Sequence, residues 1–279
     1  MKLHYYKPSP KMSNFGDELN VPIWNHFFSN YLSSDSNIVF LGIGTVLRVI
    51  KKKYSNSEKV IVFGSGSHSS NIDLPSNVEI KFVRGPLSAQ ALTNKKVPYI
   101  TDPAIIIPLV FPCKGKTKKH KFSYMPHYSV DNDNIRKAIE GLGIHYISPK
   151  DEWKSIIIQI NQTNVLLSEA MHGAIVADAY RIPWLPVYTY KSFNFFKWKD
   201  WALSQKINLK FFKLIRIYES DSVFKLFVKK KILAYKLSRI KKNKPFLSTQ
   251  DVHQINTKKI IKAIEELKTS ELFDKINFN

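Results

Sequence analysis

The sequence predicts an α/β fold in which parallel strands are covered by helices on both faces. Short apolar runs of strand length repeatedly end in glycine or polar residues, and a helical pattern follows each of them. Such strand–turn–helix units in series are typical of parallel sheets. The chain has 279 residues, 44% of them apolar, with only 10 Gly and 14 Pro. This length and composition allow one large α/β domain or two medium ones with a full core.

The first part of the chain contains four such units. The expected strands cover residues 1–6, 37–41, 59–63 and 79–83. The turns that follow them are, in order, Asn14-Phe15-Gly16-Asp17, Gly42-Ile43-Gly44, Gly64-Ser65-Gly66 and Arg84-Gly85-Pro86. Ligands of parallel sheets bind beyond the carboxyl ends of the strands. We therefore expect the polar residues of these turns to border a ligand site.

A lysine-rich run over residues 113–121 predicts a linker between two domains. After it, we expect a strand that ends at Met125-Pro126-His127, and further strands at 145–147 and 164–167. A helix is expected over 133–142. The expected domains are therefore 1–113, 121–200, and a basic amphipathic region with a C-terminal helix over 201–279.

The most informative segment is Ser168 to Ala174, which places His172 where a strand turns into a helix. A helix start presents unpaired backbone N–H groups and a partial positive charge to its surroundings. A histidine at that place can bind an anion and move a proton near neutral pH. The alternative is a hydrogen-bonded turn residue without a chemical role.

The net charge of +21 is concentrated late in the chain. Residues 206–244 hold thirteen Lys or Arg and two acidic residues, interleaved with aromatic and aliphatic side chains. This mixture is typical of an amphipathic segment on an anionic membrane. A nucleic-acid surface and an ordinary solvated basic face are the alternatives, but no recognised nucleic-acid motif is present.

Several classes of site lack support in the sequence. A disulfide framework is excluded by the single Cys113, which suits a reducing compartment. The glycine turns complete neither a GxGxxG pattern nor a P-loop, and the histidines show no metal-like spacing, so we expect no cofactor and no metal. The chain start lacks a secretory signal, and no segment is apolar enough to span a bilayer. We therefore expect a cytoplasmic protein, soluble or attached to the inner membrane face.

Six motifs in one order carry a family resemblance. They are Asn14-Phe15-Gly16-Asp17, the paired glycine turns, Val83 to Ser88, Thr101 to Ala104, Met125-Pro126-His127, and Ser168 to Ala174. Over residues 14–186 the chain resembles the polysaccharide pyruvyl transferase family. These enzymes transfer the enolpyruvyl unit of phosphoenolpyruvate to sugars, commonly as a ketal, during assembly of cell-surface polysaccharide.

The resemblance implies two Rossmann-like domains facing a cleft (GT-B-like), with a C-terminal helix that crosses back to the first domain. It implies that Arg84 grips the donor and that His172 and His127 are the family's two histidines. The Asn-x-Gly-Asp turn corresponds to Asn14, Gly16 and Asp17. One departure is Ala170, where many members carry an arginine.

The physical chemistry of these residues agrees with the resemblance. Phosphoenolpyruvate carries a phosphate and a carboxylate, which require cations and N–H groups in a water-poor cleft. His172 can hold the phosphate or protonate the donor, and Asp17 can accept a proton from a sugar hydroxyl. The alternatives are a helix-start role for Asp17, a surface ion pair for Arg84, and a hydrogen-bonded strand end for His127. The remaining candidates for substrate binding are Asn14, Gly16, Ser168, Glu169, Gly44 and Gly66.

We predict a pyruvyl transferase that acts on a lipid-linked saccharide. Residues 206–244 are expected to hold the enzyme near anionic lipid. A glycosyltransferase with a nucleotide-sugar donor is the first rival, and Glu169 is its only candidate carboxylate in the second domain. A non-catalytic basic module that binds nucleic acid is the second rival. It leaves the polar residues at the strand ends unexplained.

Overall fold

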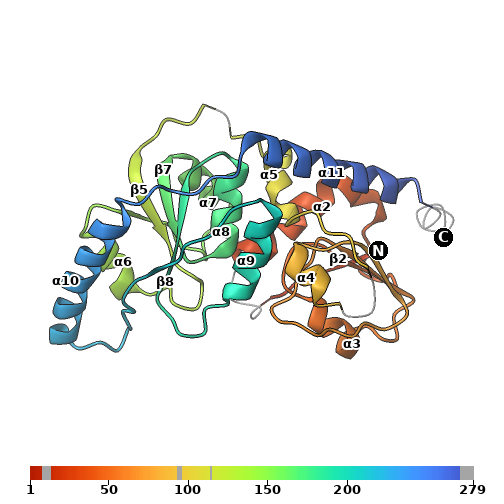
Figure 1. Ribbon diagram of the computed structural model, residues 1–279, viewed down its shortest axis with the longest axis horizontal. Helices are drawn as coiled ribbons and strands as arrows, with labels where there is room; N and C mark the ends of the chain where they lie inside the picture. The colour runs from red at the N-terminus through yellow and green to blue at the C-terminus, as the bar shows by residue number, and fades with distance from the viewer. Residues whose placement is uncertain (8–13, 93–95, 114, 271–279) are drawn as a thin grey trace.

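The computed structural model describes residues 1–7, 14–92, 96–113 and 115–270, and within them it contains two parallel sheets (Figure 1). The first sheet has the order β1-β2-β3-β4, with strands Lys2–His4, Ile38–Leu41, Lys59–Phe63 and Val78–Phe82. The second has the order β6-β5-β7-β8-β9, with β5 to β9 at His120–Met125, His145–Tyr146, Thr163–Ser168, Trp184–Tyr188 and Phe212–Lys213. The expected α/β class is confirmed.

Helices lie between the strands. The α-helices α1 to α11 cover Phe15–Glu18, Asn20–Phe28, Ile50–Lys53, Pro86–Gln90, Ile107–Val110, Asp133–Glu140, Trp153–Asn161, Met171–Ala179, Phe195–Ser204, Val223–Ile240 and Gln250–Lys268. The described ranges also contain the 3-10 helices η1 to η3, which cover Ser29–Tyr31, Leu47–Val49 and Pro103–Ile106. The helix expected around residues 46–50 is thus a 3-10 turn followed by the short α3.

The strands form where apolar residues are buried on both faces, as is typical of parallel sheets. All four residues of β2 are buried, and β2 pairs in parallel with both β1 and β3. The pairing of Ile38 with Lys59 and of Val60 with Val78 brings the ends of β2, β3 and β4 to one edge. The turns expected to border a ligand therefore share that edge.

Two expected boundaries differ from the structure. His120, expected in the linker, already pairs with Thr163 of β7, because the lysine-rich run merges into the solvent-facing start of β5. Lys114, in the same run, lies outside the described residues. Residues after 200 do not form a region of their own, because β9 pairs with β8 and the buried Leu233 and Leu237 of α10 pack in the core of the second sheet. Residues 271–279 of the expected third region also lie outside the described residues.

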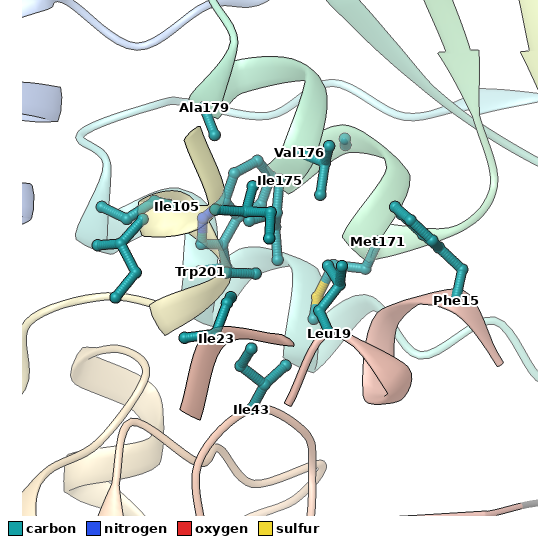
Figure 2. Packing of buried hydrophobic residues seen from close by; sticks show 14 of the residues in the cluster. Phe15, Leu19, Ile23, Ile43, Ile105, Met171, Ile175, Val176, Ala179 and Trp201 are labelled. Atoms are coloured by element: carbon teal, nitrogen blue, oxygen red, sulfur yellow. The ribbon is translucent and has the colours of Figure 1, made fainter. Parts of the chain in front are cut away.

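The two sheets are joined by a continuous core that surrounds the candidate site. Phe15 and Leu19, from the first domain, pack with Met171 and Ile175 of α8, and Trp201 of α9 belongs to the same cluster (Figure 2). Burying each large apolar side chain contributes about 1.5–3 kcal/mol. Since Asp17 lies between Phe15 and Leu19, and His172 follows Met171, this packing fixes both polar residues.

Helix α11 runs from the second domain back across the first (Figure 1). Its buried face, which consists of Ile260, Ile264 and Leu267, packs in the core shared by both domains. The expected helix over residues 257–267 is therefore present and is longer than predicted.

Candidate active site

A pocket of about 280 Å³ lies at the carboxyl ends of strands from both sheets. The residues that line it come from the segments after β1, β2, β3, β5, β6, β7 and β8, as expected for parallel sheets. They are Tyr6, Asn14, Phe15, Gly16, Asp17, Thr45, His68, His127, Tyr128, Pro149, Ala170, Met171, His172, Asn194 and Lys197. Five predicted site residues thus meet in one place: Asn14, Gly16, Asp17, His127 and His172.

His172 occupies the first turn of α8, whose N-cap Ala170 offers no side-chain hydrogen bond. Backbone N–H groups of this turn are therefore available to an anion in the pocket. The ring packs against Gly16, where an added Cβ would lie 1.8 Å from His172 Nδ1. The close approach explains why α1 requires glycine at this position.

His172 Nε2 lies 3.5 Å from Asp102 Oδ2, and neither buried atom has a hydrogen-bond partner among the described residues. The other carboxylate oxygen, Oδ1, accepts a hydrogen bond from Ala104 N at 3.0 Å, which closes an Asx turn. A small ring rotation would close the gap to Oδ2. The proton of a neutral His172 would then reside on Nε2, and Nδ1, on the side of the ring that packs against Gly16, would carry the lone pair.

Asp17 is almost fully buried, and its carboxylate accepts a hydrogen bond from the Asn14 amide. Burial raises the pKa of Asp17 to about 6, while the nearby His172 and Lys197 act in the opposite direction. Asp17 is therefore charged at neutral pH but can be protonated within the working range of an enzyme, which suits a proton acceptor.

The Asp17→Asn variant is expected to be more stable than the wild-type protein at pH 8. The raised pKa means that the folded state pays to keep this carboxylate charged above pH 6, by about 3 kcal/mol for a shift from 3.8 to about 6. This cost vanishes as the pH falls to about 4, where the carboxyl group is mostly protonated in the folded state. Urea unfolding at pH 8 and pH 4 measures the difference, and an equal difference at both pH values would contradict it.

Lys197 was not predicted from the sequence as a site residue. Among the described residues that line the pocket, it supplies the ammonium group. It lies in the first turn of α9, where its backbone N donates to the Asn194 side chain at 3.1 Å. Burial, and then the charge of Arg84, lower the pKa of Lys197 to about 8. Lys197 is therefore charged at neutral pH.

Two further histidines face the pocket in neutral form. Burial lowers the pKa of His127 to about 3, and its Nδ1 lies 2.8 Å from Ser129 Oγ. Burial also lowers the pKa of His68, with contributions from Arg48 and Arg84. These rings can donate or accept hydrogen bonds at neutral pH, but they add no charge.

Arg84 does not line the pocket, in contrast to its expected contact with the donor. Its side chain is fully buried and forms an ion pair with Asp200 of α9 at 3.0 Å. The guanidinium also donates to Thr45 Oγ1 at 3.0 Å and to Ser67 O at 2.8 Å. The ion pair is buried and joins the two domains, so it is not the surface pair considered from the sequence.

Four other candidates lie behind the lining. The Ser168 hydroxyl donates to Ala170 O at 2.7 Å, and Glu169 is buried, with burial raising its pKa to about 7. Gly44, with a φ of +130°, adopts a conformation that favours glycine. Gly66 leaves room for the Arg84 guanidinium, since an added Cβ would lie 2.2 Å from Arg84 Cζ. These residues shape the site without contacting the cavity.

Within the described residues, no group of three or more His, Cys, Asp or Glu side chains is arranged to hold a metal ion. The expected absence of a metal remains a prediction. The arrangement can bind a small anion through Lys197, the start of α8 and the amides of Asn14 and Asn194. It can also move protons through His172 and Asp17.

The sequence signal for the missed residues is weak but present. Asn194 and Lys197 follow β8 in the same strand–turn–helix pattern that drew attention to His172. The proximity of Asp102 to His172 has no local signal, because 70 positions separate the two residues in the chain.

No protein-family model matches the chain. A solved structure of an uncharacterized protein from Klebsiella pneumoniae subsp. pneumoniae has a TM-score of 0.49 at 15% identity, over 75% of this chain and 92% of that chain. Among curated proteins, the succinoglycan biosynthesis protein ExoV of Rhizobium meliloti is 35% identical over 207 residues. This alignment covers 72% of the chain and 64% of ExoV, so the chain spans less than two thirds of that relative. The relationship agrees with the six ordered motifs and supports the resemblance of the chain to the polysaccharide pyruvyl transferase family.

Proposed function

We propose that this protein transfers the enolpyruvyl group of phosphoenolpyruvate to a sugar of a cell-surface polysaccharide or its lipid-linked precursor. The observation that carries the proposal is the pocket lining, which combines Lys197 and His172 with one carboxylate, that of Asp17, among the described residues. A small donor with a phosphate and a carboxylate fits such a lining. The name of the relative, succinoglycan biosynthesis protein ExoV, supports a polysaccharide product. A GT-B-like cleft between the domains is part of the proposal.

The proposed reaction begins with proton transfer. Protonated His172 gives a proton to the C3 methylene of the donor while a sugar hydroxyl attacks C2. Asp17 accepts the proton of that hydroxyl. The C2–O bond to phosphate then breaks, and a second hydroxyl of the same sugar attacks C2 to close the ketal.

The protons balance in this scheme. The two sugar hydroxyls release two protons, and C3 gains one from His172. One hydroxyl proton restores His172, and the other passes through Asp17 to the departing phosphate. Lys197 and the start of α8 stabilise the negative charge of the phosphate as it leaves.

Acceptor-dependent phosphate release tests the function. The wild-type protein is mixed with phosphoenolpyruvate and a crude lipid-linked saccharide extract, with extract lacking lipid-linked saccharide as the control. We expect phosphate release only with the acceptor, and its loss in the His172→Ala variant. Thermal stabilisation by UDP or GDP, without release from phosphoenolpyruvate, would contradict the proposal and favour a nucleotide-sugar donor.

We also propose that helix α10 holds the protein at an anionic membrane surface. Within the described ranges, no helix is both long and apolar enough to cross a bilayer. On α10, however, Phe224, Val228 and Tyr235 are exposed and lie on one helix face, since they are spaced by four and seven residues. The opposite face packs on the core through Leu233 and Leu237. The helix is therefore apolar on two sides, and within the described part of the chain one of them is covered and the other is exposed.

Lysines flank the exposed apolar face. Lys225, Lys230 and Lys231 are exposed and make no ion pair with a described residue, whereas Lys229 pairs with Asp221 at 2.6 Å. Each lysine near an anionic bilayer contributes about 1 kcal/mol, and buried aromatic side chains add to this. Charge complementarity therefore favours anionic lipid over a second basic copy of the chain.

Changing these lysines to glutamate is expected to weaken vesicle binding about a hundredfold. The variant carries Lys225→Glu, Lys230→Glu and Lys231→Glu, and flotation with phosphatidylcholine vesicles, with and without phosphatidylglycerol, measures the effect. A matched control changes the exposed Lys258, Lys259 and Lys262 of α11 in the same way. Equal flotation on both vesicle types, or equal loss in the control, would contradict the role of α10.

A further inference from the structure

Helix α9 holds Lys197 between the two domains. Its N-cap Asn194 also donates to His68 O of the first domain at 3.4 Å. One turn after Lys197, Asp200 accepts hydrogen bonds from the Ser88 N–H at 2.9 Å and from the Ser88 hydroxyl at 2.5 Å. The backbone of Lys197 is therefore anchored on both sides, and the position of its side chain is set by both domains.

The Lys197 ammonium has no partner of its own. It makes no hydrogen bond and no ion pair with any described residue, although its side chain is partly withdrawn from solvent. Asp17 acts on it through charge alone, and the nearby Arg84 is already neutralised by Asp200. A shielded ammonium is costly unless an anion compensates it, and the lining around it forms a cavity.

The other groups of the lining complete an anion site. Asn14 and Asn194 provide amides, and the start of α8 provides backbone N–H groups. Ala170, at the position where many family members have an arginine, lines the same cavity and brings no charge. Among the described residues that line this cavity, Lys197 is thus the one lysine, and no arginine is present.

We propose that Lys197 binds the anionic group of the donor and thereby sets the donor specificity of this protein. The ligand class is a small organic anion that carries both a carboxylate and a phosphate, so the identification of the donor rests on the proposed function. A lysine binds such a group as a compact point charge, without the fixed two-pronged geometry of an arginine. The site should therefore tolerate either the carboxylate or the phosphate in contact with Lys197.

Calorimetric titration with phosphoenolpyruvate tests the inference. We expect the dissociation constant to rise at least tenfold in the Lys197→Met variant, because a charge-assisted contact is lost. The Lys197→Arg variant should recover part of the affinity, since the charge remains. Lys199→Met, which changes an exposed lysine of the same helix, should bind like the wild-type protein. Wild-type affinity should also fall as the pH rises through about 8, where Lys197 loses its charge.

The outcomes separate this inference from the proposed function. If Lys197→Met binds phosphoenolpyruvate like the wild type and still transfers it, the inference is overturned and the function stands. If the wild type does not bind phosphoenolpyruvate but binds inorganic phosphate in a Lys197-dependent manner, the anion site stands and the proposed donor is overturned. If Lys197→Met fails to fold, the affinities of the wild type and of Lys197→Arg for phosphoenolpyruvate are compared at pH 7 and pH 10. The inference requires that the affinity of the wild type falls between these pH values and that the affinity of Lys197→Arg stays equal.

Discussion

Replacing Arg84 by alanine is expected to destabilise the protein by about 3–5 kcal/mol, a large part of the stability of a typical domain. The substitution leaves the Asp200 carboxylate buried, with Ser88 as its remaining hydrogen-bond partner among the residues that the structure describes. It also removes the hydrogen bonds to Thr45 and Ser67. Because a buried charge without its counter-ion is far more costly than a lost surface contact, the effect should exceed that of most single substitutions.

Urea unfolding measures this loss, and Lys59→Ala provides a matched control. Lys59 pairs with Glu79 at 2.9 Å in the same domain, but both side chains are partly exposed. Its removal should cost at most about 1 kcal/mol. Unchanged stability of Arg84→Ala, together with a raised KM for the donor, would contradict the structural role and place Arg84 in donor binding, as the family resemblance implies.

The fold could be predicted from local patterns because each strand and its turn carry their own signal. The strand at Lys59–Phe63 lies where its apolar run predicted it, and the helix at Asp133–Glu140 begins at the expected residue. The attachment of β9 and α10 to the second sheet could not be predicted in this way. The basic residues of that region dominate its composition, while the few buried ones, such as Leu233, decide its packing.

The candidate site was predictable only in part, for a related reason. His127 and His172 follow shortly after strands, and Asn14 and Asp17 lie in the segment that connects β1 to its helices, so their sequence positions already indicate one edge of a sheet. Arg84 and Asp200 are 116 positions apart, and no local sequence pattern near either residue predicts that they pair. Lys197 is one of 43 basic residues, and only the three-dimensional structure separates it from the others.

Removing the imidazole in His172→Ala is expected to lower kcat by about 10²–10⁴-fold, the usual contribution of a general acid or base. Asp102→Asn tests how the ring is held. The asparagine oxygen can still accept the hydrogen bond of Ala104 N, so the turn that begins η3 is retained. Only the negative charge near His172 Nε2 is lost.

An amide N–H placed against Nε2 would favour the tautomer with the proton on Nδ1, which cannot accept a proton from a sugar hydroxyl. We therefore expect Asp102→Asn to lower kcat while the donor KM stays close to that of the wild type. Nitrogen-15 NMR of the His172 ring should show the change of tautomer, which a purely structural role for Asp102 would not produce. The double variant should be no slower than His172→Ala alone, because the two residues act as a unit. Additive losses would mean that Asp102 acts through the fold and not through the ring.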